Sequence, residues 1–93
     1  MTASRAFALS DADIRLLTRC AQGHTFRPAD AEEDGFERLV DRLRGLRDRG
    51  LLRLDEGRFM KAKDGRHLMA GPCDLTDAGR HALDRDRRLG PRA

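Results

Sequence analysis

The sequence predicts a small α+β domain in which helices predominate. Apolar residues recur at helical spacing over residues 36–46, and a glycine and a short apolar run follow them. Helix-start signals at Ser10 and Thr76 predict one further helix on each side of this segment. The pair Asp64-Gly65 predicts a β-hairpin between the central helix and the last one.

Size and charge limit what such a chain can be. Its 93 residues suffice for one domain with a modest core and no deep enzyme cleft, because typical domains have about 100–150 residues. The net charge of +3 is compatible with a nucleic-acid partner. There is no signal-peptide pattern and no apolar run of about 20 residues, so a soluble cytoplasmic protein without a membrane segment is expected. The predicted domain covers residues 10–89, with an N-terminal arm at 1–9 and a tail at 90–93.

The first helix is predicted to begin at a capping box. Ser10 is its N-cap and Asp13 its third residue, so each side chain can accept a hydrogen bond from the other's backbone N–H. Leu9 and Ile14 are spaced as a hydrophobic staple. The helix is expected to end near Gln22-Gly23 with one apolar face, formed by Ile14, Leu17, Cys20 and Ala21.

The following segment leaves two alternatives open. Capping-box patterns starting at Asp30 and at Asp34 compete for the start of a helix. Either a short helix over about residues 28–33 precedes a separate helix from about Gly35, or a single helix runs from Pro28 to Arg49. We favour the break, because glycine weakens a helix interior.

The central helix, over about residues 36–49, has the strongest pattern. Its apolar residues recur at i, i+3, i+4 and i+7, and charged residues occupy the other face. Gly50 follows a last turn with Arg47 and Arg49, which is typical of a glycine C-cap with cations near the negative end of the helix dipole. Residues 51–54 then indicate a strand. The predicted buried face consists of Phe36, Leu39, Val40, Leu43 and Leu46.

The hairpin is bounded by two turn signals. Residues 55–57 end the first strand, and Asp64-Gly65 is typical of a two-residue hairpin loop. Residues 24–27 can add a single β-bridge. The flanks of the loop are expected to lay one apolar face on the helices, formed by Phe59, Met60, Leu68 and Met69.

The last helix is predicted to start after Thr76, its N-cap. Gly71-Pro72 ends the preceding strand, and the charged stretch 84–88 is expected to fray. A thin apolar stripe on this helix consists of Ala78, Ala82, Leu83 and Leu89.

Two motifs in the second half of the chain resemble a known arrangement. Val40-x-x-Leu43-x-x-Leu46-x-x-x-Gly50-Leu51-Leu52 is similar to the passage from recognition helix to strand in MarR-like and PadR-like transcriptional regulators. Leu75-Thr76-x-x-Gly79-Arg80-x-x-Leu83 resembles the start of the helix that follows the wing in the same families. Together the motifs cover about Val40–Leu83. The resemblance implies a winged helix-turn-helix fold, with three N-terminal helices, a β-hairpin wing and a C-terminal helix.

This resemblance implies a regulator that binds double-stranded DNA, usually as a homodimer. The recognition helix, at about residues 36–49, would enter the major groove, and the basic wing, at about 58–67, would contact the backbone or the minor groove. Arginine suits such contacts because its guanidinium group pairs with guanine or clamps a phosphate. The predicted contact residues are Arg38, Arg42 and Arg49 in the helix and Arg58, Lys61, Lys63, Arg66 and His67 in the wing.

An alternative interpretation of the same surface stays open. The helix face can be a solvated face with ion pairs, for example between Asp41 and Arg44, and the lysines can serve only to protect the hairpin edge. The same fold would then be a protein-protein interaction module, an adaptor without DNA binding.

No metal site, cofactor or catalytic centre is predicted. Cys20, His24, His67 and Cys73 supply the ligand count of a structural zinc site, but their spacings match no common finger or ribbon. We therefore expect reduced, packing cysteines and surface histidines. Nothing in the sequence pairs Cys20 with a base, and no phosphate-binding loop or hydrolase motif occurs, so the chain is not expected to be an enzyme.

Overall fold

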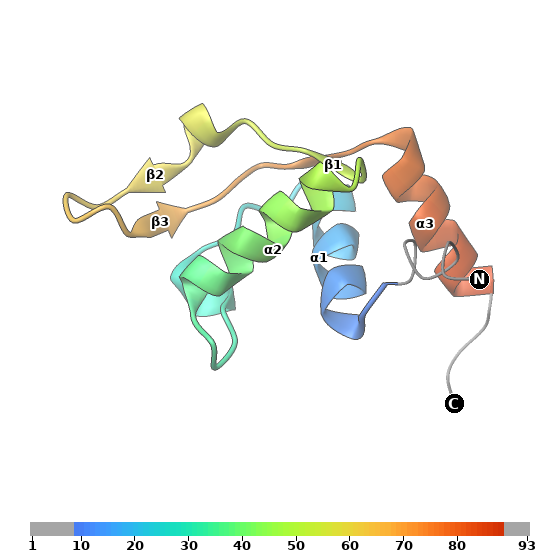
Figure 1. Cartoon of the computed structure of the whole chain (residues 1–93), viewed down its shortest axis with the longest axis horizontal. Helices are drawn as coiled ribbons and strands as arrows, with labels where there is room; N and C mark the ends of the chain where they lie inside the picture. Colours follow the sequence, from blue (N-terminus) through green and yellow to red (C-terminus); the bar gives the residue numbers. More distant parts are fainter. Residues whose placement is uncertain (1–8, 89–93) are drawn as a thin grey trace.

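Three helices and four short strands make up the described part of the chain, which is residues 9–88 of a computed structural model (Figure 1). The fold is a small, mostly helical α+β structure, as the sequence predicts. The predicted tail, Leu89 and all of the predicted arm except Leu9 lie outside the described residues. The elements are α1 (Asp11–Ala21), α2 (Phe36–Asp48), β1 (Leu52–Arg53), β2 (Met60–Lys61), β3 (His67–Met69), β4 (Asp74–Leu75) and α3 (Asp77–Arg88).

The capping box of α1 is confirmed. Ser10 Oγ accepts the backbone N–H of Asp13 at 3.0 Å, and Asp13 Oδ2 accepts that of Ser10 at 3.3 Å. The apolar face is turned slightly from the predicted one, because Leu16 is buried and Ala21 is exposed. The residues of α1 that enter the core are Leu16, Leu17 and Cys20.

The break before α2 is confirmed, but the predicted short second helix shrinks to a single 3-10 turn, Pro28–Asp30. Neither predicted capping box opens α2, which begins directly after Gly35. The carboxylate of Asp30 accepts the backbone N–H of Arg27 at 2.8 Å, and Asp34 is paired with Arg42 at 2.8 Å. Asp30 therefore caps the preceding 3-10 turn, and Asp34 pairs with a side chain two turns into α2, so neither carboxylate caps the start of α2.

All five apolar positions predicted for α2 are buried, so its amphipathic pattern is confirmed. The glycine C-cap is confirmed as well. Gly50 has φ of +81°, and the N–H of Leu51 donates to the carbonyl of Leu46 at 3.0 Å, which closes the helix end. The chain then turns sharply into β1.

The segment after α2 forms two antiparallel sheets of two strands each, and in the chain the inner pair of strands lies between the two strands of the outer pair. β1 pairs with β4, β2 pairs with β3, and the predicted single bridge forms between Phe26 and Ala70. The β2–β3 hairpin and α3 lie at opposite ends of the molecule, with α1 and α2 between them (Figure 1). Side chains from all three helices and the β1–β4 sheet meet in one core, which Phe59 and Ala70, at the base of the β2–β3 hairpin, also join.

The hairpin tip differs from the predicted two-residue loop. Ala62 N–H donates to the Arg66 carbonyl at 2.8 Å, and Gly65 N–H donates to the Ala62 carbonyl at 3.0 Å. These bonds enclose three loop residues, Lys63, Asp64 and Gly65, of which Gly65 has φ of +91°. Such a loop is the next commonest after the two-residue one.

The apolar face predicted for the hairpin is only half correct. Phe59 is buried, but Met60 is 55% exposed and Leu68 is 45% exposed. Both residues of β2 are exposed, whereas in β3 His67 is buried, Leu68 exposed and Met69 half-buried. Met60 and Leu68 are therefore the large apolar side chains that the hairpin presents to solvent.

The start of α3 is confirmed at Thr76, whose Oγ1 accepts the backbone N–H of Gly79 at 3.0 Å. Leu83 is buried and Ala82 packs against the core, whereas Ala78 is exposed. The helix continues through the charged stretch to Arg88. Within residues 9–88, no helix has the length and apolar character that crossing a bilayer requires.

Candidate nucleic-acid interface

The eight predicted contact residues fall into three groups that the sequence does not distinguish. Four are exposed cations that form no ion pair with any described residue. Three more are cations that a carboxylate already holds. The eighth, His67, is buried. The unpaired cations are Arg38 in the first half of α2 and Arg58, Lys61 and Lys63 in and beside the hairpin.

The unpaired cations of α2 and the hairpin belong to the same end of the molecule. Glu37, the neighbour of Arg38, is hydrogen-bonded to His67, and His67 is the cross-strand partner of Lys61. Arg27, which the prediction omitted, follows the bridge between Phe26 and Ala70 and forms no ion pair in the described part. Among the other arginines and lysines whose side chains the structure describes, Arg53 and Arg85 also lack an ion pair.

Ion pairs hold the other predicted arginines. Arg42 donates to Asp34 at 2.8 Å, Arg49 to Asp13 at 3.4 Å, and Arg66 to Asp64 at 2.7 Å. Solvent screens these partly exposed pairs, yet each carboxylate cancels much of the charge that a phosphate would meet. The second half of α2 is therefore a poorer anion-binding surface than its arginine content indicates.

His67 does not join this surface, contrary to the prediction. Its side chain is buried, and its Nδ1 lies 2.8 Å from Oε1 of Glu37. The sequence places it among basic hairpin residues, but β3 turns it inward beneath Phe59, whose ring it meets edge-on. Solvent exposure of a hairpin residue depends on this packing, which no local pattern encodes.

The sequence also does not indicate an ion-pair network that Glu56 forms with α2. Glu56 accepts from Arg44 at 2.8 Å and from Arg47 at 2.7 Å. The hydrogen bond from Arg44, with that from Arg47, lowers the pKa of Glu56 to about 2. Sequence separations of 12 and 9 residues give no helical signal for these pairs, so only the folded chain reveals them. They fasten the connection between β1 and β2 to α2.

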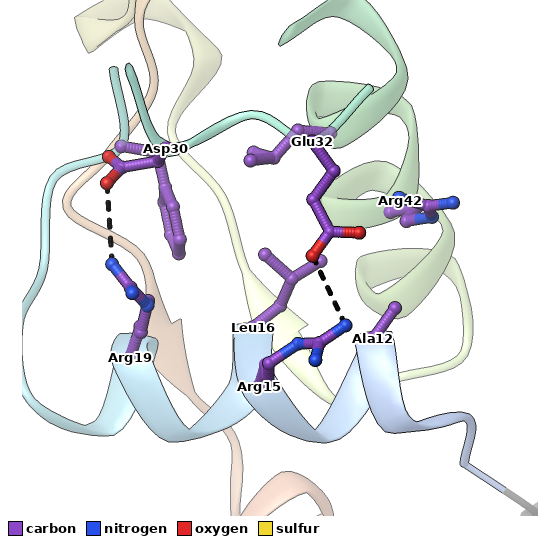
Figure 2. A pocket seen from close by; sticks show the side chains of 9 residues that line it. Ala12, Arg15, Leu16, Arg19, Asp30, Glu32 and Arg42 are labelled. Atoms are coloured by element: carbon purple, nitrogen blue, oxygen red, sulfur yellow. Dashed lines mark hydrogen bonds and ion pairs between the residues drawn. The ribbon is translucent and has the colours of Figure 1, made fainter. Parts of the chain in front are cut away.

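A small pocket lies where the short second helix was predicted (Figure 2). Its volume of about 80 Å³ is well below the range of about 300–1,000 Å³ typical of ligand sites. Arg15 pairs with Glu32 at 3.2 Å and Arg19 with Asp30 at 3.4 Å across it, which ties this segment to α1. The pocket is therefore a small packing gap between α1 and the segment that follows it, and not a typical ligand site.

Both cysteines are buried and free. A hydrogen bond to Cys73, with burial, raises the pKa of the Cys20 thiol, so this thiol is neutral and a poor nucleophile. His24 lies 3.0 Å from Asp30 and His67 contacts Glu37, so the two histidines face different partners. Among the described residues, no three or more His, Cys, Asp or Glu are grouped as a metal site.

No model of a protein family, no curated protein and no solved structure matches this chain.

Proposed function

We propose that this chain is a winged helix-turn-helix domain that binds double-stranded DNA and regulates transcription. The observation that carries the proposal is the group of unpaired cations at one end of the molecule. Arg38 contributes from α2, Lys61 and Lys63 from the hairpin, and Arg58 from the turn just before it; residues 58–67 are the wing of this proposal. We call these four residues the basic surface.

The order of elements supports the winged-helix assignment. A helix, a short turn, a second long helix, a hairpin and a last helix follow one another. The two motifs that resemble MarR-like and PadR-like regulators also contact each other, because Thr76 Oγ1 donates to the Gly50 carbonyl at 2.6 Å. Gly79 packs so closely on the Leu51 carbonyl that a side chain would not fit. The motif residues thus join the end of α2 to the start of α3.

The wing would supply most of the DNA contact. Three of its cations are free to approach phosphates, whereas α2 adds Arg38 and keeps its other arginines in ion pairs. Binding would then depend mainly on counterion release from the DNA backbone, which makes the affinity fall steeply with salt. Arg38 is the α2 residue best suited to reach a guanine or a phosphate.

The test is fluorescence anisotropy with a labelled random-sequence duplex at several salt concentrations. We expect the logarithm of the affinity to fall linearly with the logarithm of the salt concentration. The double variant Lys61→Glu/Lys63→Glu should bind at least about tenfold more weakly, with a salt slope reduced by about one for each phosphate that the variant no longer neutralises.

The matched control is Arg80→Glu/Arg85→Glu, which makes the same change in net charge on α3 at the opposite end of the molecule (Figure 1). Arg80 and its partner Asp77 are both exposed and 4.0 Å apart, so little structure depends on this pair. Equal loss of binding in both double variants would mean that only net charge matters. No binding by the wild type at low salt would refute the proposal.

Binding to a protein partner is the second candidate function, and two exposed apolar side chains of the hairpin support it. Met60 and Leu68 are the large apolar side chains that the described chain exposes. A protein that covers them would bury apolar area, and its affinity would not follow the counterion law. The variant Met60→Ser/Leu68→Ser would weaken such a complex, and light scattering on both forms would show whether a homodimer uses this face.

A further inference from the structure

Glu37 and His67 form a specific polar contact between α2 and the hairpin. The backbone N–H of His67 donates to Oε2 of Glu37 at 2.6 Å, and Nδ1 of His67 lies 2.8 Å from Oε1. The backbone bond and the ring bond lower the pKa of Glu37, so the group is a carboxylate at neutral pH. An ionised carboxylate can only accept, and Nδ1 must therefore carry the proton.

The His67 side chain that makes this contact is buried. The residue is 6% exposed, and its Nε2 is buried without a hydrogen-bond partner in the described structure. Nδ1 is therefore the ring nitrogen that makes the polar contact, and Glu37 fixes the orientation of the ring.

The contact also joins the two parts of the basic surface. Arg38 is the next residue to Glu37 on α2, and Lys61 lies opposite His67 in the β2–β3 ladder. We propose that Glu37 and His67 are positioning residues that hold the wing against α2, so that Arg38, Lys61 and Lys63 meet one stretch of DNA together. The DNA part of this proposal rests on the proposed function.

The direction in which one substitution changes the DNA affinity distinguishes a positioning role of Glu37 from a purely electrostatic one. Glu37 is an acid beside a surface proposed to bind phosphate, so removing its charge would strengthen DNA binding if it did nothing else. Glu37→Gln retains the shape of the side chain but has only one oxygen. At most one of the two hydrogen bonds that the carboxylate accepts from His67 can therefore be kept. If Glu37 positions the wing, the same substitution weakens binding.

The experiment compares Glu37→Gln with the control Asp41→Asn by anisotropy. Asp41 is an exposed acid of the same helix that pairs with Arg44, away from the hairpin contact. We expect Glu37→Gln to bind DNA about tenfold more weakly, with an unchanged salt slope because every cation of the surface is retained. Asp41→Asn should bind as the wild type or slightly tighter. Equal or tighter binding by Glu37→Gln would overturn the proposal.

A second measurement on the free protein decides the positioning role even if the wild type binds no DNA. Hydrogen exchange of the Ala62 and Gly65 amides, which close the wing loop, should become about tenfold faster in Glu37→Gln. The Phe26 and Ala70 amides, which pair outside the loop, should keep their rates. Unchanged exchange at Ala62 and Gly65 would overturn the proposal, whereas faster exchange without DNA binding would refute only the proposed function.

Two histidine variants and one spectrum test the assigned atom. The side-chain amide of His67→Asn can replace the Nδ1–H donor, whereas that of His67→Gln lies nearer the position of Nε2. We expect His67→Asn to retain slower exchange at Ala62 than His67→Gln. Nitrogen-detected NMR of the wild-type imidazole should show a proton on Nδ1, and an Nδ1 without a proton would overturn the assignment.

Discussion

Glu56 illustrates how single side chains organise this highly charged chain. Its carboxylate accepts hydrogen bonds from Arg44 and Arg47 on successive turns of α2, and these bonds hold its pKa at about 2. From the sequence, Arg44 is expected to pair with Asp41 on the same helix face and Arg47 to lie near the negative end of the helix dipole, and neither spacing indicates Glu56. Their partner lies beyond the end of the helix, so their role depends on where the chain returns.

Replacing Glu56 by glutamine tests this role through pH. The folded-state pKa of Glu56 is below the ordinary 4.5, so its charge stabilises the fold above about pH 4.5, and this contribution is lost as the pH falls toward 2. We expect Glu56→Gln to lower the free energy of unfolding by about 1 kcal/mol at pH 7, since the pair is partly exposed. The difference from wild type should shrink between pH 4.5 and 2. Urea denaturation followed by far-UV circular dichroism measures both.

Glu33→Gln is the control for this series, because Glu33 is exposed and forms no ion pair with the described residues. Its stability should match that of the wild type at every pH. A loss of stability in Glu56→Gln that is as large near pH 2 as at pH 7 would show that shape, and not charge, accounts for the contribution of Glu56.

At the scale of elements, the ends of the helices are set by nearby residues, whereas the buried face of a strand depends on tertiary packing. Ser10, Gly50 and Thr76 act within a few residues of their own positions, and all three are predicted correctly. Gly79 combines the two cases, since it lies in a regular helix but contacts the Leu51 carbonyl of the chain beyond α2. Gly45, by contrast, has open space around its Cα.

The two helical glycines should respond in opposite ways to alanine. Gly45→Ala adds a methyl group in open space and removes backbone freedom from the unfolded chain, so it should stabilise the protein by up to about 1 kcal/mol. Gly79→Ala drives a methyl group into the Leu51 backbone and should destabilise it by about 1–3 kcal/mol. Thermal unfolding should show a change of about 4–8 °C per kcal/mol. A tolerated Gly79→Ala would contradict the close packing of α3 on this turn.

For the whole molecule, one core holds elements that could not be stable alone. The strands have two or three residues each, and α1 has eleven. Leu17 is fully buried among side chains from the helices and the sheets. The folded state should therefore be cooperative, with the hairpin end and the α3 end depending on the same core.

Leu17→Ala tests this cooperativity. We expect the free energy of unfolding to fall by about 2–5 kcal/mol, as for other large-to-small changes in a core. The amides of Leu51 and Ala70, in different parts of the fold, should lose protection from hydrogen exchange by the same factor as the whole molecule unfolds. Loss at one amide and retention at the other would indicate two independent units.

The amino-acid sequence by itself determined the three α-helices, the caps at Ser10, Gly50 and Thr76 and the buried face of α2, because each depends on residues within one or two turns. It did not determine the start of α2, where neither predicted capping box forms. Phe36, Leu43 and Gly50 are examples, and all three have the predicted burial or backbone conformation. The hairpin location is equally local, since Gly65 supplies the positive φ that the turn needs.

Only the tertiary structure decided which charges are free and which face of the hairpin is covered. Asp34, Glu37 and Glu56 each find a cationic or N–H partner that sequence spacing does not indicate, and His67 is buried where Met60 and Leu68 are exposed. A side chain's local pattern fixes its direction from its own element, but the neighbour that it meets depends on how elements pack. The proposed basic surface therefore consists of four of the cations that folding leaves without an ion pair in the described part of the chain.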